Sequence, residues 1–284
     1  MGEFVEALFN PDIPFLWTAL IAGLLASFAF GVVGSYVIVR RISYIAGSIA
    51  HCVLGGIGAG LFLQVKIGWT WFDPMYGAII AAILAAVIIG MVSLYSSQRE
   101  DTIIGALWAV GMAVGLLFIA RTPGYVDPMS YLFGNILLIS TSDIWLILIL
   151  DIVVVGAGLL FYNKLLAICF EEEFVSLRGV NAKVYFMFLL ILTALTVVLM
   201  VRIVGIVLVI ALLTLPPAVA GILTRKLWHM MVMAILFSAI FIILGISASY
   251  IYDIPSGPTI IVFAAVVYLV SLIGAKLVRK VVNT

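Results

Sequence analysis

Charged residues are scarce in this chain. Asp, Glu, Lys and Arg make up 10% of its 284 residues, while 66% are hydrophobic. A soluble domain carries about 25% charged residues, so this composition excludes a soluble fold. The formal net charge of +1 provides no basic surface for nucleic acid, and we expect no such partner. We predict an all-α polytopic membrane protein in which residues 1–284 form a single transmembrane domain within the lipid bilayer.

Cysteine and two common signals are also sparse or missing. The chain has two cysteines, Cys52 inside a predicted span and Cys169 near a predicted loop, so we expect no disulfide framework. There is no G-x-x-x-x-G-K-[ST] sequence, so the chain does not itself cradle the phosphates of ATP. Residues 1–14 lack the basic segment that begins a signal peptide. We therefore expect the first hydrophobic run to remain as a membrane anchor.

What fills the chain instead is a series of hydrophobic runs of about 20 residues, the length needed to cross a bilayer. They predict nine spans, or eight if the sixth and seventh form one broken pair. A short amphipathic helix near residues 3–12 is predicted to lie at the interface. Residues 121–135, with two prolines and two glycines, predict a surface loop or a re-entrant piece. The predicted spans are residues 15–39, 40–63, 75–95, 102–120, 143–162, 184–201, 204–223, 230–250 and 259–277.

Lysine and arginine fall mainly on one side of these spans. If Arg40 and Arg41 are cytoplasmic and the spans alternate, eleven of the 14 basic residues lie inside. Basic residues are enriched in cytoplasmic loops. We therefore predict an external N-terminus and a cytoplasmic C-terminus.

The second span carries His51, one of two histidines in the chain. Imidazole suits zinc, copper, nickel or iron, and a titratable group at membrane depth is a candidate functional site. The alternative is that His51 hydrogen-bonds a backbone carbonyl and only packs the bundle. Gly47 and Gly55 lie one turn to either side of His51 on a helix, so we expect open space around the imidazole. Cys52 points about 100° away and is a poor co-ligand.

Glycines recur in the second and fourth spans. Gly56 and Gly60 form a G-x-x-x-G pair, as do Gly111 and Gly115. In lipid, small residues let helix backbones approach closely. We interpret most of these glycines as packing contacts. The alternative is that a glycine-rich helix lines a translocation path and can shift.

The polar interval after the fifth span predicts a short cytoplasmic helix near residues 170–180. Acids at its start and a basic residue and a glycine at its end suit the helix dipole and a C-terminal cap. Such a helix would let a membrane subunit press against a soluble partner, whereas the alternative is a solvated loop helix without one. The candidate contact residues are Glu171, Glu172, Glu173, Phe174, Arg178 and Gly179.

Three further positions are candidates for a path or a gate. Asp151 is an acid inside the fifth span, where it must be paired or face water. Packing against a polar neighbour is the alternative to a role in transport. Pro216 and Pro217 lie inside the seventh span, where each is expected to break the helical hydrogen-bond ladder. We interpret His229, which lies beside basic residues at a membrane boundary, as an interfacial residue and not a ligand.

Four stretches together resemble the membrane permeases of zinc- and manganese-type ABC importers, the ABC-3 family. Their order and spacing carry the resemblance, which extends over nearly the whole chain. The stretches are residues 31–44 running into Ala50 and His51, residues 131–137, residues 171–180, and residues 204–213 with 216–218 followed by 253–258.

This resemblance implies a homodimeric permease of the type II, metal-chelate importer kind, in the plasma membrane of a prokaryote. It implies cytoplasmic ABC ATPase subunits bound at the helix around residues 171–179, and an extracytoplasmic metal-binding protein. The chain itself would be no enzyme and would hold no permanent cofactor. In the family, an Asp four residues before the histidine contacts the metal together with that histidine. Here Gly47 stands at the Asp position, so only His51 carries over.

The expected cargo is a divalent metal ion, zinc first and manganese next, because an imidazole without a carboxylate fits zinc better. One alternative is the same architecture moving an iron–siderophore, cobalamin or other metal chelate. Another is an ion-coupled carrier without an ATPase that uses Asp151 and His51. An ATPase that co-purifies with the chain would exclude the carrier.

Overall fold

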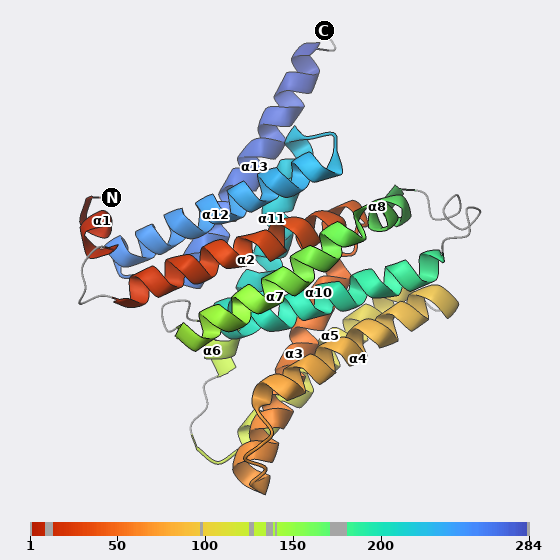
Figure 1. The fold of residues 1–284 in the computed structure, drawn as a ribbon, viewed down its shortest axis with the longest axis vertical. Helices are drawn as coiled ribbons and strands as arrows, with labels where there is room; N and C mark the ends of the chain where they lie inside the picture. The colour runs from red at the N-terminus through yellow and green to blue at the C-terminus, as the bar shows by residue number, and fades with distance from the viewer. Residues whose placement is uncertain are drawn as a thin grey trace. The chain divides into compact units, whose positions relative to one another are not determined.

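All regular structure in the described residues is helical (Figure 1). The computed structural model describes residues 2–8, 14–96, 99–124, 128–134, 139, 141–170 and 181–282. Nine helices in these ranges are long and apolar enough to cross a membrane, with spans of 18 to 26 residues. Each of them coincides with one predicted span. The prediction of an all-α polytopic membrane protein is therefore confirmed.

The chain divides into two compact units built from non-contiguous segments. Unit 1 comprises Met1–Ile38, Asn135–Leu159 and Ala211–Thr284, and unit 2 comprises Val39–Gly134 and Leu160–Ile210. The helices of unit 1 are α1 (Gly2–Leu8), α2 (Pro14–Val39), α7 (Thr141–Leu160), most of α11 (Ile206–Leu223), α12 (Leu227–Tyr252) and α13 (Ser256–Val282). Those of unit 2 are α3 (Ser43–Leu61) with its π-helical extension η1 (Phe62–Ile67), α4 (Pro74–Tyr95), α5 (Glu100–Arg121), α6 (Pro128–Phe133), α8 (Tyr162–Phe170) and α10 (Ala182–Val204).

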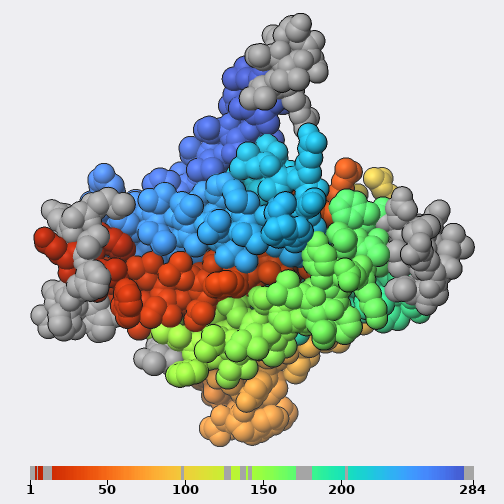
Figure 2. Space-filling model, turned by 45° about the horizontal axis from the view of Figure 1, so that its top comes forward, coloured from red at the N-terminus to blue at the C-terminus, as the bar shows by residue number. Residues whose placement is uncertain are grey.

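In unit 1, α2 lies alongside α12 and α7 (Figures 1 and 2). The backbone of α2 approaches α12 at Gly31, where an added Cβ would stand 2.7 Å from the backbone nitrogen of Ile235. Tyr36 of α2 donates its hydroxyl to the carbonyl of Gly158 on α7, at 2.9 Å. A small residue and one buried phenol thus form contacts that join α2 to α12 and to α7.

Pro216 and Pro217 do not end the helix, because α11 runs from Ile206 to Leu223 with both prolines inside it, in agreement with the predicted span over residues 204–223. Pro217 has no N–H for the carbonyl four residues before it, which is that of Leu213. That carbonyl faces Gly34 of α2, at a point where an added Cβ would collide with it. The close approach of Gly34 therefore lies at the carbonyl that Pro217 leaves without its helical donor.

In unit 2, α3 packs against α4, α5 and α10. Its span is 83% buried inside the protein, against 39% for the span of α4 and 17% for that of α5. A helix that is apolar all round is typical of such a central position. The second predicted span is therefore the core of this unit, and it carries His51.

The predicted loop or re-entrant piece at residues 121–135 contains the six-residue helix α6, which packs against α10. Directly after α6, Gly134 has a φ of 63° and meets the backbone of Gly205, whose φ is 81°. Both positions combine left-handed backbone with a close approach, and both need glycine. The predicted N-terminal helix is present as α1, where Phe4 is buried against Tyr250 of α12 at 6.1 Å between ring centroids.

Candidate functional site

The helix α3 is wedged between α4 and α5 by glycine-to-glycine contacts. On the α4 side, the backbones of Gly56 and Gly77 meet so closely that a Cβ on either would collide with the other's carbonyl. On the α5 side, a Cβ at Gly55 would stand 2.9 Å from the carbonyl oxygen of Gly111. A Cβ at Gly115 would stand 2.6 Å from the carbonyl oxygen of Leu54. The interpretation of these glycines as packing contacts is confirmed.

Polar side chains of α3 reinforce its contact with α5. Ser48 donates to the carbonyl of Ile104 at 2.9 Å, and Cys52 donates to that of Leu107 at 3.3 Å. The two donors are one helical turn apart, so they face the same neighbour. The Cys52 thiol is therefore already engaged with α5.

His51 is buried in the centre of this arrangement, with 8% of its surface exposed. Its ring stacks on the indole of Trp108 from α5, with 4.3 Å between ring centroids and 23° between the ring planes. Its Nδ1 is buried and has no hydrogen-bond partner among the described residues. The alternative in which this nitrogen bonds a backbone carbonyl is not what the structure contains.

The expectation of open space around the imidazole is wrong. A Cβ at Gly47 would stand 2.9 Å from Cζ3 of Trp108, so an aromatic ring fills the space that the glycine leaves. The other neighbour on α3, Gly55, is closed by the backbone of Gly111. Glycine permits close approach, and here the approaching groups are a ring and a helix backbone rather than solvent.

Sequence reasoning missed Trp108 and its neighbour Tyr44. The Tyr44 ring lies 5.7 Å from that of Trp108, so the indole has Tyr44 and His51 as ring neighbours. Tyr44, Gly47 and His51 are spaced to share one face of a helix, and that spacing was the one signal available. Nothing in the sequence indicates which aromatic residue of another span covers this face.

Asp151 is also buried, but it belongs to unit 1 while His51 belongs to unit 2. It lies on α7 with 6% of its surface exposed. Its carboxyl lies beside the backbone of Ala29 on α2, outside hydrogen-bonding geometry, and neither oxygen has a partner among the described residues. A carboxylate in this position requires a proton, water or an ion for compensation.

The remaining candidates divide into a surface residue and a segment outside the described structure. His229 is exposed near the start of α12 and lies against Trp228 at 3.7 Å between ring centroids, consistent with the predicted interfacial role. The predicted coupling residues Glu171, Glu172, Glu173, Phe174, Arg178 and Gly179 lie outside the described residues.

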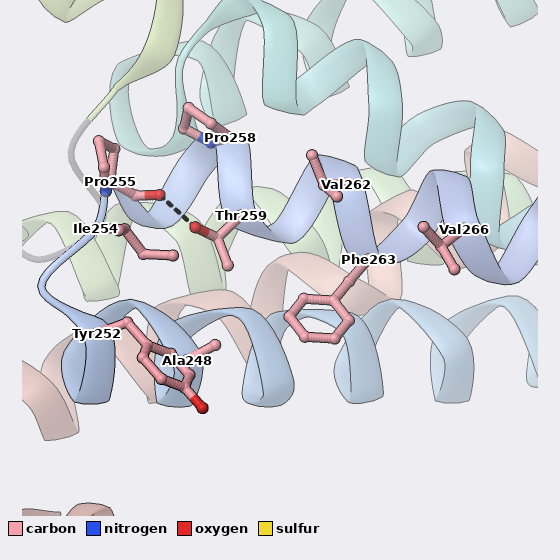
Figure 3. Close-up of a pocket in the computed structure, with 9 residues that line it drawn as sticks. All are labelled: Ala248, Tyr252, Ile254, Pro255, Pro258, Thr259, Val262, Phe263 and Val266. Carbon is pink, nitrogen blue, oxygen red and sulfur yellow. Dashed lines mark hydrogen bonds between the residues drawn. The ribbon is translucent and has the colours of Figure 1, made fainter.

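No group of three or more His, Cys, Asp or Glu side chains in the described residues could hold a metal ion. Two grooves in the described residues are lined almost entirely by apolar side chains. One of about 540 Å³ lies between the end of α12 and the start of α13, where Tyr252, Phe263 and Val266 point into it (Figure 3). Another of about 380 Å³ lies between α4 and α5 over α3, and Cys52 is its one titratable lining residue. Neither lining offers the set of oxygen, nitrogen or sulfur donors that a resident cation needs.

Comparison with known proteins identifies the family of the chain. The model of a family described as "ABC 3 transport family" matches residues 12–275. A "Probable metal transport system membrane protein" of Chlamydia trachomatis is 38% identical over 261 residues, which are 92% of this chain and 89% of that protein. The "Manganese transport system membrane protein MntC" of Listeria monocytogenes is 34% identical over 272 residues, or 96% of this chain and 94% of that protein. Among solved structures, "PsaBC from Streptococcus pneumoniae in complex with Fab" is similar with a TM-score of 0.83 and 29% identity, covering 95% of this chain and 94% of that one.

Proposed function

The chain belongs to the ABC 3 transport family as a metal-transport permease, and on that premise we propose that its cargo is zinc in preference to manganese. The observation that carries this proposal is the buried imidazole of His51 with its unpartnered Nδ1. Imidazole suits zinc, whereas manganese prefers carboxylate and carbonyl oxygens. No group of three or more His, Cys, Asp or Glu side chains in the described residues includes His51.

The manganese names of several relatives support a divalent cation as the class of cargo. We assign the ion from the donors of this chain, because ligand type rather than architecture separates the two metals. Manganese is the runner-up.

The same proposal includes the partners. ABC ATPase subunits would bind on the cytoplasmic side at the predicted helix around residues 171–179, and an extracytoplasmic protein would deliver the ion to a homodimer of this chain. The chain would lie in a prokaryotic plasma membrane, with its N-terminus outside and its C-terminus inside, because that orientation leaves most basic residues in the cytoplasm.

The proposed mechanism is alternating access. ATP binding would close the two ATPase subunits, which would press on the cytoplasmic helices and rock the permease halves. The ion would pass along α3 by the imidazole of His51. Gly47 would belong to this path, and Asp151, Pro216 and Pro217 in unit 1 would be gating positions.

A metal chelate is the second candidate cargo. The fold supports it, since a "putative metal-chelate type ABC transporter" is similar with a TM-score of 0.68 at 15% identity. The packing of α3 disfavours it, because glycine contacts on two sides leave this helix no room for a bulky complex.

The test is metal uptake in cells that lack their own zinc importers and express this permease with its ATPase and binding protein. His51→Ala should lower zinc uptake at limiting zinc by at least about tenfold, because a metal-contacting donor is lost. His229→Ala is the matched control and should leave uptake unchanged. Wild-type uptake by His51→Ala would remove His51 from the path, and stronger competition by manganese than by zinc would reassign the cargo.

A further inference from the structure

One face of α3 is covered by a single indole ring. Tyr44, Gly47 and His51 are three and four residues apart and therefore share a face of the helix. The ring of Trp108 lies 5.7 Å from that of Tyr44 and 4.3 Å from that of His51, between centroids. Its Cζ3 atom lies 2.9 Å from where a Cβ of residue 47 would stand. A side chain at position 47 and an indole at position 108 therefore exclude each other in this geometry.

Position 47 is where α3 would place a second ligand for an ion held by His51. Residues four apart on a helix have their Cβ atoms about 5 to 6 Å apart, within reach of one ion. The indole of Trp108 fills that place. The other polar side chains of α3 on the side of α5 are turned away, since Ser48 bonds the carbonyl of Ile104 and Cys52 that of Leu107.

We propose that Trp108 is a specificity-determining residue of this permease. Its ring keeps a second ligand away from the Gly47 side of His51, so that an ion passing here meets an imidazole and no carboxylate. Such a donor set favours zinc over manganese. This inference rests on the proposed function, because it requires that the cargo contacts His51.

The indole also orients the imidazole. The two ring planes are 23° apart, so the indole restricts rotation of the histidine ring about its own bond. The orientation of the unpartnered Nδ1 is restricted with it. Groups that orient a metal ligand typically change affinity by about ten- to hundredfold when they are removed.

The test compares zinc and manganese uptake by the complete transporter in cells that lack their own importers of both ions. Trp108→Ala opens the place beside Gly47 and should lower the ratio of zinc to manganese uptake. The pair Trp108→Ala with Gly47→Asp places a carboxylate in the opened space. It should shift that ratio toward manganese by about tenfold or more, because an oxygen donor now joins the imidazole.

Gly47→Asp alone should lower uptake of both ions, since the new Cβ meets the indole and displaces the ring that orients His51. Addition of Trp108→Ala should restore uptake to this variant. Such a rescue would show that the side chains at positions 47 and 108 compete for the same space, because two independent substitutions would add their losses instead. A ratio that stays at the wild-type value in the double variant would overturn the proposal, provided that the protein reaches the membrane at the wild-type level.

Trp145→Ala is the matched control, because Trp145 is 62% exposed on α7 in unit 1. It should leave the ratio of zinc to manganese uptake unchanged.

His51→Ala separates the proposed role of Trp108 from the proposed function. If it abolishes uptake while every Trp108 variant keeps the wild-type ratio, the role of Trp108 fails and the proposed function stands. If it transports at the wild-type rate, the proposed function fails first.

Tryptophan fluorescence of the purified complex gives a second readout that does not depend on transport. Since Trp108 stacks on His51, zinc added to the purified complex should alter the fluorescence of this one among the six tryptophans. The zinc-induced change should disappear in Trp108→Phe and in His51→Gln, and should persist in Trp145→Phe. A change that persists in Trp108→Phe would overturn the proposal. If Trp108→Ala does not accumulate, Trp108→Phe with Gly47→Asp takes its place in the uptake assay.

Discussion

His51 and Asp151 are two buried polar groups in membrane spans, and their surroundings differ. His51 lies on α3, whose span is 83% buried inside the protein, whereas Asp151 lies on α7, whose span is 22% buried. The imidazole is covered by an aromatic ring at 4.3 Å. The carboxyl lies beside the backbone of α2 and has no partner among the described residues.

The two sites differ because the surfaces of α3 and α7 allow neighbouring helices to approach to different distances. Glycines on α3 bring neighbouring helices into backbone contact on two sides, so the imidazole is enclosed by the fold as a whole. On α7, Gly156 has no atom within 4 Å of its added Cβ, and large apolar residues such as Ile152 and Leu160 are exposed. Burial of Asp151 is therefore a local matter between α7 and α2. The tightly packed helix α3 and the more open helix α7 should therefore respond differently to the same kind of substitution.

The largest difference is expected between glycines of the two helices. Gly56→Leu should prevent stable folding, at a cost above about 3 kcal/mol, because its side chain would collide with the backbone of Gly77. Gly156→Leu should change the free energy of unfolding by no more than about 1 kcal/mol, since its surroundings are open. Thermal unfolding of the purified permease in detergent measures both. Equal losses would show that α3 is not packed more tightly than α7.

Asp151→Asn should raise the free energy of unfolding by up to about 2 kcal/mol, because a carboxyl without a partner is replaced by a group that never carries charge. If Asp151 is a gating position, Asp151→Asn should also lower metal uptake severalfold, because residues that serve function are often kept at a cost in stability. Asp143→Asn, in the first turn of the same helix, should instead lose about 0.3 to 1 kcal/mol of favourable interaction with the helix dipole. Increased stability with wild-type uptake would assign Asp151 to packing alone.

Tyr36→Phe removes the hydrogen bond from α2 to the carbonyl of Gly158 on α7. The expected loss is about 1 kcal/mol in the free energy of unfolding, the usual net contribution of one such bond. Tyr252→Phe provides the control, since Tyr252 is 72% exposed and should tolerate the change. A loss from Tyr36→Phe no larger than the control would show that apolar packing alone holds α2 against α7.

The last prediction concerns the reactivity of Cys169 on α8, outside the candidate spans, and no change in stability is expected. Burial raises the pKa of its thiol to about 11, while the nearby Arg40 acts in the opposite direction. Because the thiolate is the reactive form, alkylation at pH 8 should be on the order of a hundredfold slower than for an ordinary exposed thiol, and its rate should increase with pH up to about 11. Arg40→Gln should raise the pKa further and slow alkylation again. Fast labelling at pH 8, detected by mass spectrometry, would show that the half-buried surroundings of this thiol do not raise its pKa.

Much of the fold could be predicted because hydrophobic length and glycine content act locally. All nine helices that can span the membrane in the described ranges coincide with predicted spans. Close packing at Gly56 follows from the same rule, whereas its partner Gly77 is known only from the structure. The helix that contains Pro216 and Pro217 is among these predicted spans, but the packing of Gly34 against the carbonyl of Leu213 could not be predicted, because it depends on how α2 is placed against α11.

The sequence alone determined that this protein lies in the membrane, which segments cross it, and that His51 is its candidate metal contact. The tertiary structure decided what surrounds that imidazole, and the answer is an indole where open space was expected. Trp108 and His51 lie on different spans, and the stacking of two rings from different helices depends on helix rotation and register. The glycine contacts of the whole unit set the rotation and the register of the helices, and the sequence around either residue does not predict them.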